Sequence, residues 1–428
     1  MPSPALVAIP SQWAVVAISV GIVLAAAALT WDGKRVDTPT YEQAAVRMLE
    51  GEAIYRAADR PPFTYPPFFA LVWVPFRLVP EAGRLLAWNL CNMTLLVAIV
   101  AQVVALVRPW VAERPGRTRR LDAICIGIVA VLGVRFLVSP LEYRAHDYVV
   151  LLAVLLSAGG IARGEQAAAG GWAGLATACK ATPLLLLPMF VWQRRWRAAI
   201  VMAVATAALT LLPDLVAPQS TGRPWVLDWY DTFVSRVDVG AAAAAPGAWK
   251  SWNVLNQSLS GTLYRLFTPV APGFDRWDVS LAAIGPTGLR LLVVGCQGAI
   301  LAALAWGTWR TDDERPPDAR SRFRTLGHFS AALCGMLLCS PMSSKQHFCG
   351  LFPAITFATC SAVYGRRSPL LLACLATVFV TGTLFAKDLL GSQARLQVQA
   401  YGATTLCAVA CLAAVLEALR NLRTGDRP

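Results

Sequence analysis

Apolar segments long enough to cross a lipid bilayer recur along this 428-residue chain. The first runs from about residue 13 to residue 30, and others follow at intervals to residue 419. Since about twenty apolar residues in a helix span the hydrocarbon core, the chain is predicted to be an all-α, polytopic integral membrane protein. The composition agrees, because 15% of residues are charged whereas soluble domains carry about 25%.

About twelve helices are expected to cross or enter the bilayer, as one transmembrane domain over residues 1–428. Their expected ranges are 13–30, 84–107, 121–138, 148–161, 168–180, 182–192, 197–213, 281–308, 325–339, 348–364, 370–387 and 396–419. Lys180 and Pro183 interrupt the apolar stretch 168–192, so one kinked helix or two short helices are both compatible with it.

The net charge of +13 is explained by clusters of basic residues between the apolar segments. These clusters lie at 108–120, 194–197, 310–324, 366–367 and 420–427. Since Lys and Arg are enriched in cytoplasmic loops, we expect these segments and both termini to be cytoplasmic in a plasma-membrane protein. Because this distribution accounts for the charge, no nucleic-acid partner is expected.

The opposite face then carries two large extracytoplasmic loops, 31–80 and 214–280. Residues 66–80, PPFFALVWVPFRLVP, are apolar but short and interrupted by proline, so we expect a surface helix that does not span. If 66–80 did span, the five arginines of 108–120 would lie outside. In the second loop, NQSLSGTLYRLF at 256–267 is typical of an amphipathic surface helix.

Asp37, in the first outer loop, is the candidate catalytic residue. Thr38 and Pro39 form a typical helix start, so the carboxylate could simply stabilise a helix N-terminus. Alternatively, a carboxylate at the outer membrane surface can take a proton from a hydroxyl nucleophile and act as a general base. The residue types leave both interpretations open.

Three further ionisable residues are candidates for binding a phosphate. Lys180 lies between apolar segments, where an ionisable side chain points to function. Lys345 and His347 follow the outer end of another expected helix. Plain interfacial polar residues are the alternative for that pair.

Four more residues are candidates for holding a phosphate or a sugar. Asn256 and Gln257 lie at a helix start, where amide groups and free N–H groups suit phosphate or sugar hydroxyls. Tyr65 could shape a groove beside Asp37, or belong to an aromatic interface belt. Arg144 adds positive charge at another outer helix end.

The cysteines and histidines form no recognisable metal or disulfide pattern. Most of the eleven Cys lie inside apolar segments, and none belongs to a CxxC motif. The three His, at 146, 328 and 347, make no pair at helical spacing. No metal and no cofactor are therefore expected.

Several of these segments together resemble glycosyltransferase family 87. The resemblance is carried by Asp37 with GEAIY and FTYPPF, by GLATACKATPLLLLPMFVWQRRWRAA, by NQSLSGTLYRL and by SPMSSKQHF. They occur in the family's order between about residues 30 and 365. The family contains GT-C fold, polyprenyl-phosphate-sugar-dependent mannosyltransferases, including the actinobacterial phosphatidylinositol-mannoside enzymes.

The resemblance implies a GT-C fold in which Asp37 is the catalytic aspartate, His347 lies near it and Lys180 faces the lumen. Two departures bear on the substrates. The family's Gly-Gln-x-Asn at the start of the fourth helix reads AHDY at 145–148. Many members have an aromatic residue and two His after Ser-Pro, whereas here Ser344, Lys345 and Gln346 intervene and only His347 remains. These departures leave the sugar and the acceptor open.

The expected function is transfer of a hexose, with mannose implied by the resemblance, from a polyprenyl-phosphate donor. The acceptor is a hydroxyl of a lipid or glycan at the extracytoplasmic face, and the outcome is inversion. Asp37 would be the base, while Lys180, Lys345 and His347 would stabilise the leaving phosphate. One carboxylate suffices because the phosphate leaves as an anion. A monomer surrounded by membrane lipids is expected.

Two other functions remain compatible with the sequence. A transporter or flippase of lipid-linked sugars would be expected to contain repeated halves with broken helices, and no such repeat is visible. A non-catalytic membrane scaffold would not need Asp37, Lys180 and His347 to meet. A shared cavity would favour an enzyme.

Overall fold

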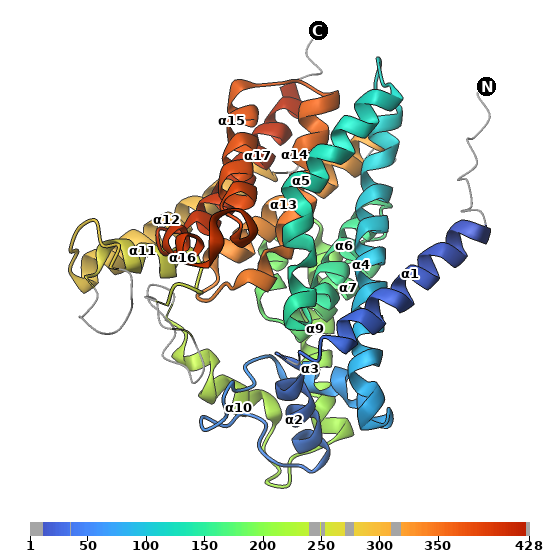
Figure 1. Ribbon diagram of the computed structural model, residues 1–428. Coiled ribbons are helices and arrows are strands. Elements are labelled where there is room, and N and C mark those ends of the chain that lie inside the picture. Colours follow the sequence, from blue (N-terminus) through green and yellow to red (C-terminus); the bar gives the residue numbers. More distant parts are fainter. Residues whose placement is uncertain are drawn as a thin grey trace.

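The computed structural model describes residues 12–34, 36–238, 249, 253–269, 278–309 and 318–424. Within these ranges the chain is helical and contains no β-strand (Figure 1). Arg310, Arg315 and Arg427 of the basic clusters, and parts of the expected loop 214–280, lie outside the described residues.

The α-helices are α1 (Gln12–Trp31), α2 (Thr38–Leu49), α3 (Pro67–Trp73), α4 (Glu81–Ala112), α5 (Arg119–Tyr143), α6 (Asp147–Ala162), α7 (Gln166–Cys179), α8 (Leu186–Trp192), α9 (Trp196–Val216), α10 (Trp225–Thr232), α11 (Leu259–Phe267), α12 (Pro286–Gly307), α13 (Ala319–Cys339), α14 (Leu351–Tyr364), α15 (Pro369–Val378), α16 (Lys387–Ala400) and α17 (Ala403–Thr424). The 3-10 helices are η1 (Val74–Leu78), η2 (Thr182–Leu185), η3 (Val234–Arg236) and η4 (Lys345–Gly350), and η5 (Phe379–Leu384) is a π-helix.

Six described helices are long and apolar enough to cross a membrane. They are α4, α5, α9, α12, η4 with α14, and α17, and a bent pair of helices would make a seventh if counted as one span. The expected count of about twelve is therefore not confirmed. The physical reason is length: α6 has 16 residues, which is about 24 Å of helix, less than the hydrocarbon core.

The stretch 168–192 forms two helices. Helix α7 ends at Cys179, Lys180 is extended with φ −156° and ψ 129°, and η2 and α8 follow. Pro183 lies in the first turn of η2, where its missing N–H leaves no unmade hydrogen bond. The break places the Lys180 side chain at a gap between helices.

The C-terminal region differs from the expectation of a loop at 388–395 and one helix over 396–419. Residues 387–400 form α16, which bends by 94° from the preceding α15–η5 segment. Gly402, with φ +83°, then separates α16 from α17. Only residues without a Cβ adopt such a φ readily, so this glycine permits the second change of direction.

Three helices from the two expected outer loops gather at one end of the bundle. Helices α2, α3 and α10 lie together there, opposite the C-terminal end of α17 (Figure 1). The apolar piece Pro67–Leu78 is too short to cross a membrane, as expected for 66–80. Helix α11 begins where Ser258 accepts a hydrogen bond from the N–H of Gly261, as expected for 256–267.

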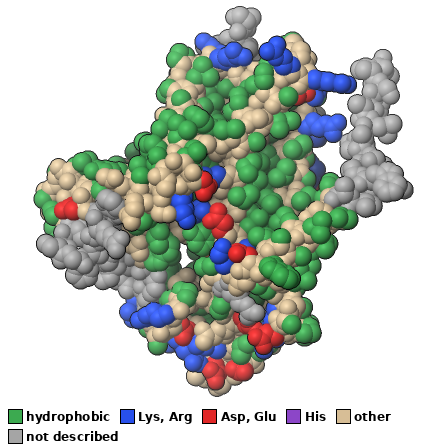
Figure 2. Space-filling model, viewed as in Figure 1, with side chains coloured by type: hydrophobic (Ala, Val, Ile, Leu, Met, Phe, Trp, Pro, Cys, Tyr) green, Lys and Arg blue, Asp and Glu red, His purple; other side chains and the backbone are tan. Residues whose placement is uncertain are grey.

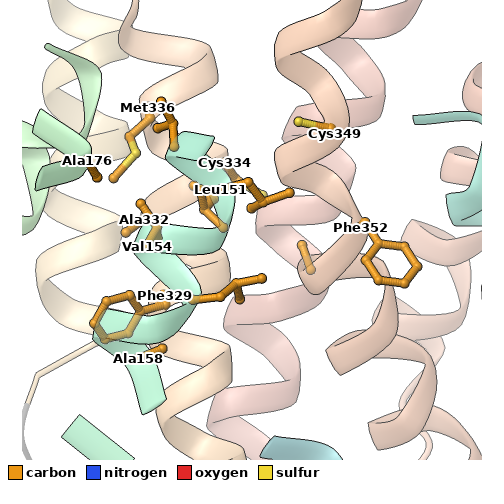
Figure 3. Packing of buried hydrophobic residues seen from close by; sticks show 14 of the residues in the cluster. Leu151, Val154, Ala158, Ala176, Phe329, Ala332, Cys334, Met336, Cys349 and Phe352 are labelled. Carbon is orange, nitrogen blue, oxygen red and sulfur yellow. The ribbon is translucent and has the colours of Figure 1, made fainter. Parts of the chain in front are cut away.

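The core of the bundle forms around α13 and α14, which are buried along most of their length. Phe329, Ala332 and Met336 of α13 face Leu151 and Val154 of α6 (Figure 3). Burial of such side chains contributes about 1.5–3 kcal/mol each against water, whereas against lipid close packing itself supplies the stabilisation. This core positions the turn 340–347, which follows the end of α13.

Glycines allow α7 and α9 to pack closely. A Cβ on Gly170 would lie 2.4 Å from the carbonyl oxygen of Ala198. A Cβ on Gly174 would lie 2.6 Å from the Cβ of Ala205. Small residues at such positions let helix backbones approach in membranes.

We expect Gly170→Leu to destabilise the protein, because overpacking a close contact costs about 1–3 kcal/mol. Gly171→Leu is the matched control, since a Cβ there meets nothing within 4 Å. The measurement is the melting temperature of purified protein in detergent. Equal melting temperatures for the two variants would contradict the close α7–α9 contact.

Candidate active site

Asp37 immediately precedes α2 but does not cap it. Its side chain makes no capping hydrogen bond to the helix. Its backbone N–H donates to the carbonyl of Tyr143 at 3.2 Å, which ties the start of α2 to the end of α5. The carboxylate is therefore available for another role, and helix capping does not account for it.

Tyr41 links Asp37 to a histidine of another element. Its hydroxyl lies 3.4 Å from Oδ2 of Asp37 and 3.2 Å from Nδ1 of His146. The Tyr41 ring is buried and packs edge-on against Tyr65 and Phe69. This packing holds the hydroxyl between the two polar partners.

Asp147 and Lys180 form a buried ion pair. The Lys180 Nζ lies 2.7 Å from Oδ1 of Asp147, and the two side chains are 13% and 6% exposed. The other oxygen of Asp147 is buried without a hydrogen-bond partner in the described structure. The pair joins the start of α6 to the break after α7.

His347 lies beside this pair. Its Nδ1 accepts a hydrogen bond from the N–H of Ser344 at 3.2 Å, so the neutral ring carries its proton on Nε2. His347, Asp147 and Lys180 line one cavity of about 50 Å³ with Ser343. That volume holds water but is smaller than a sugar ring.

A larger cavity of about 300 Å³ lies on the other side of η4. Asp37 lines it together with Tyr143 and, of the other predicted residues, Lys345 and Gln257. The turn at the start of η4 contributes Ser343 and His347 to the small cavity and Ser344 and Lys345 to the large one. The two cavities are thus neighbours across this turn.

The remaining predicted residues lie around these cavities without lining them. The guanidinium of Arg144 donates to the backbone carbonyls of Leu141 and Leu29. The amide of Asn256 donates to the carbonyl of Pro341 at 3.1 Å. Tyr65 packs its ring against His146, with the ring centroids 4.3 Å apart.

Two of the predicted residues that line the large cavity already have partners. Lys345 pairs with Glu142. The Gln257 amide donates to the carbonyl of Gln399 at 2.8 Å, while its Oε1 is buried without a partner. The binding roles predicted for these residues stay predictions.

Burial raises the pKa of the Asp37 carboxyl from 3.8 to about 7, and the negative charge of Asp147 acts in the same direction. The hydrogen bond from Tyr41 and the charge of Lys180 act the opposite way. Burial lowers the pKa of His146 to about 3, so this ring is neutral at neutral pH. Asp37 is therefore balanced between its acidic and basic forms near pH 7.

Sequence reasoning missed three residues of this region. Tyr41 lies four residues after Asp37. In a helix this spacing puts the two side chains on one face, which could have identified Tyr41 as a neighbour of Asp37. Arg135 lines the large cavity from within the apolar run 121–138, and the rule that singled out Lys180 applies to it equally. Arg395 also lines that cavity, but its position in an expected loop gave no signal.

The described residues hold no group of three or more His, Cys, Asp or Glu side chains arranged to bind a metal ion. The predicted absence of a metal and a cofactor stays a prediction.

One family model and several mannosyltransferases match this chain. A family model for glycosyltransferase family 87 matches residues 63–341 of the 428. A polyprenol-phosphate-mannose-dependent alpha-(1-2)-phosphatidylinositol mannoside mannosyltransferase of Mycobacterium tuberculosis is 26% identical over 75% of this chain and 69% of its own length. The Mycolicibacterium smegmatis protein of that name is 26% identical over 78% of this chain and 71% of its own.

A pentamannoside mannosyltransferase of Mycobacterium tuberculosis is also similar, at 28% identity over 78% of this chain and 69% of its own length. The crystal structure of ArnT from Cupriavidus metallidurans bound to undecaprenyl phosphate aligns with 96% of this chain and 78% of its own, at 14% identity and a TM-score of 0.42. Because the family model covers well over half of the sequence, the chain belongs to glycosyltransferase family 87.

Proposed function

We propose that the protein transfers mannose from a polyprenyl-phosphate donor to a hydroxyl of a lipid or glycan acceptor at the extracytoplasmic face. The donor class follows the names of its relatives in Mycobacterium and Mycolicibacterium. The observation that carries the proposal is the position of Asp37. Its carboxylate makes no capping hydrogen bond to α2 and lines a cavity of about 300 Å³. A pKa of about 7 suits this carboxyl to general base catalysis near neutral pH.

In the proposed reaction the Asp37 carboxylate removes the proton of the acceptor hydroxyl. The acceptor oxygen then bonds to the anomeric carbon from the face opposite the phosphate, and the bond from that carbon to the phosphate oxygen breaks. Its electron pair leaves with the polyprenyl phosphate, so the configuration inverts. The proton remains on Asp37 until it passes to solvent.

Positive charge near the cavities favours the leaving phosphate at longer range. Lys345 lines the large cavity and pairs with Glu142, and Lys180 lines the neighbouring cavity and pairs with Asp147. The Nε2–H of His347 is the donor that its ring has available, because Nδ1 already accepts from Ser344. Fixed donors and charges of this kind, in a site with little water, are effective at stabilising developing negative charge.

The alternative functions are less well supported. Membership of a glycosyltransferase family does not favour a transporter or flippase. A scaffold would have no reason to place Lys180 and His347 in one cavity and Asp37 in the next. The three residues do not share a single cavity, but the charge of Lys180 acts on Asp37.

We further propose that the end of the bundle opposite α2 and α10 is cytoplasmic. In Figure 2 the Lys and Arg side chains at that end have few acidic neighbours, whereas at the other end they are mixed with Asp and Glu. The end opposite α2 and α10 includes the described basic clusters at 108–120, 194–197 and 366–367. By the positive-inside rule, the cavities near the other end then face outward.

Replacement of Asp37 by Asn tests the base. Asn keeps the shape but accepts no proton, so we expect normal expression and melting with turnover reduced about a hundredfold or more. The assay is transfer from radiolabelled polyprenyl-phosphate mannose in membranes. Glu50→Gln is the control, because Glu50 is exposed at the opposite end of the same helix. Glu42 is unsuitable, since it pairs with Arg77 and Arg84. An Asp37→Asn variant with most of its activity would exclude the base role.

The pH dependence follows from the groups around Asp37. The base must be ionised, so kcat/KM is expected to rise with pH through about 7. Asp147→Asn removes a charge that raises the pKa of Asp37, and should move this rise to lower pH. Tyr41→Phe removes a hydrogen bond that lowers it, and should move the rise to higher pH. If the pH profiles of the two variants shifted in the same direction, the proposed effects of Asp147 and Tyr41 on the pKa of Asp37 would be contradicted.

Cysteine labelling tests the orientation. Gly116 and Gly222 form a matched pair, since both have positive φ and a Cβ at either meets nothing within 4 Å. In a background without native cysteines, an impermeant thiol reagent added outside intact cells should label Gly222→Cys and not Gly116→Cys. The reverse pattern would invert the topology.

A further inference from the structure

Two arginines line the large cavity without a carboxylate partner. Arg135 projects from α5 and Arg395 from α16. The Arg135 guanidinium donates to the carbonyl of Gly382, and Nε of Arg395 is buried with no hydrogen-bond partner. Over the described ranges, neither forms an ion pair with Asp or Glu. A cation in a membrane-embedded helix is costly without an anion, so this cavity lacks its counter-charge.

The other basic groups near the site are already neutralised. Lys345 pairs with Glu142, and Lys180 pairs with Asp147 at 2.7 Å. An anion entering from outside would therefore find unpaired positive charge at the two arginines. Arginine also offers a planar fork of donors that fits phosphate oxygens in pairs.

Asp37 lines the same cavity from a different element. It precedes α2, whereas Arg135 belongs to α5 and Arg395 to α16. One cavity of about 300 Å³ thus contains a base and two cations that come from different elements. Inverting transfer requires a base and a phosphate site that are separate, because the base and the leaving phosphate lie on opposite faces of the sugar.

An apolar groove adjoins the arginines. It has a volume of about 670 Å³ and is lined mainly by aliphatic side chains of α5, α14 and α15, with Phe379 of η5. On α5 the groove ends at Val131 and Leu132, and Arg135 follows about one helical turn later. In η5, Phe379 lines the groove, and the carbonyl of Gly382 accepts a hydrogen bond from Arg135.

We propose that Arg135 and Arg395 bind the phosphate of the polyprenyl-phosphate donor, and that the adjoining groove holds the first part of its hydrocarbon chain. This assignment rests on the proposed function. The sugar then extends from the arginines toward Asp37. Lys180 acts at longer range, through the charge balance of Asp147 and Asp37. The donor reaches the site sideways from the bilayer, between α5 and the α15–η5 segment.

The test measures equilibrium binding of polyprenyl phosphate, which carries no sugar, to full-length protein in nanodiscs of neutral lipid. Arg135→Gln and Arg395→Gln should each weaken binding about tenfold, since each removes a hydrogen bond between charged groups. Arg135→Lys should lose less, because it keeps the charge but not the fork. Arg108→Gln, an exposed arginine at the far end of α4, is the control. Uncharged polyprenol should bind all variants alike.

A separate variant tests whether the groove holds the hydrocarbon chain. Gly127 lines the groove, and a Cβ there meets nothing within 4 Å, so Gly127→Leu adds a side chain at the groove with no clash at its first atom. We expect a higher KM for a long-chain donor and little change for a short-chain analogue. Equal effects on both donors would overturn the groove assignment.

Other outcomes separate the site from the reaction. Unchanged polyprenyl-phosphate binding by both arginine variants would overturn the proposed phosphate site. The site would also be overturned if Lys180→Met lost binding while the arginine variants kept it. Loss of phosphatidylinositol binding, with polyprenyl phosphate bound normally, would overturn the donor assignment in favour of the acceptor's phosphate. Arginine-dependent binding by a wild-type protein that transfers no mannose would support the site and overturn the proposed function.

Discussion

The buried ion pair between Asp147 and Lys180 is the interaction on which the site depends. Asp147 starts α6, and Lys180 follows the last residue of α7, so the pair joins the beginning of one helix to the end of the next. Breaking a buried pair by removing one partner typically costs about 3–5 kcal/mol, because the remaining charge has no counterpart. The pair also sets the electrostatics, since its two charges act on Asp37 in opposite directions.

Aromatic packing fixes the position of the side chain that hydrogen-bonds to Asp37. Tyr41 is buried among aromatic rings, and its single hydroxyl lies between Asp37 and His146. A hydroxyl has one proton, so it donates to one neighbour while accepting from the other. The protonation of Asp37 is thereby linked to the hydrogen bonding of a histidine that burial keeps neutral. Few side chains around the carboxylate are free to move.

The rigid part of the bundle decides which residues face each other. Helices α13 and α14 form its core, and the turn between them separates the small cavity from the large one. Ser344 supports His347 on one side of this turn, while Lys345 faces the other. The arginines arrive from α5 and α16, which are far apart in sequence. The site is therefore assembled from elements that only the packed bundle brings together.

The sequence by itself determined the membrane class, the basic clusters, the short helix within 66–80 and the candidate Asp37, because bilayer thickness, charge and proline act locally. It also placed Ser258 at the start of α11. Only the tertiary structure decided that Lys180 meets Asp147, that α16 bends back at 94°, and that Arg395 reaches the cavity of Asp37. Helix length explains the difference in the count of spans, since short apolar helices such as α6 are buried by neighbours rather than by lipid. Apolar periodicity reports that a helix is buried, but packing between distant helices decides what it faces.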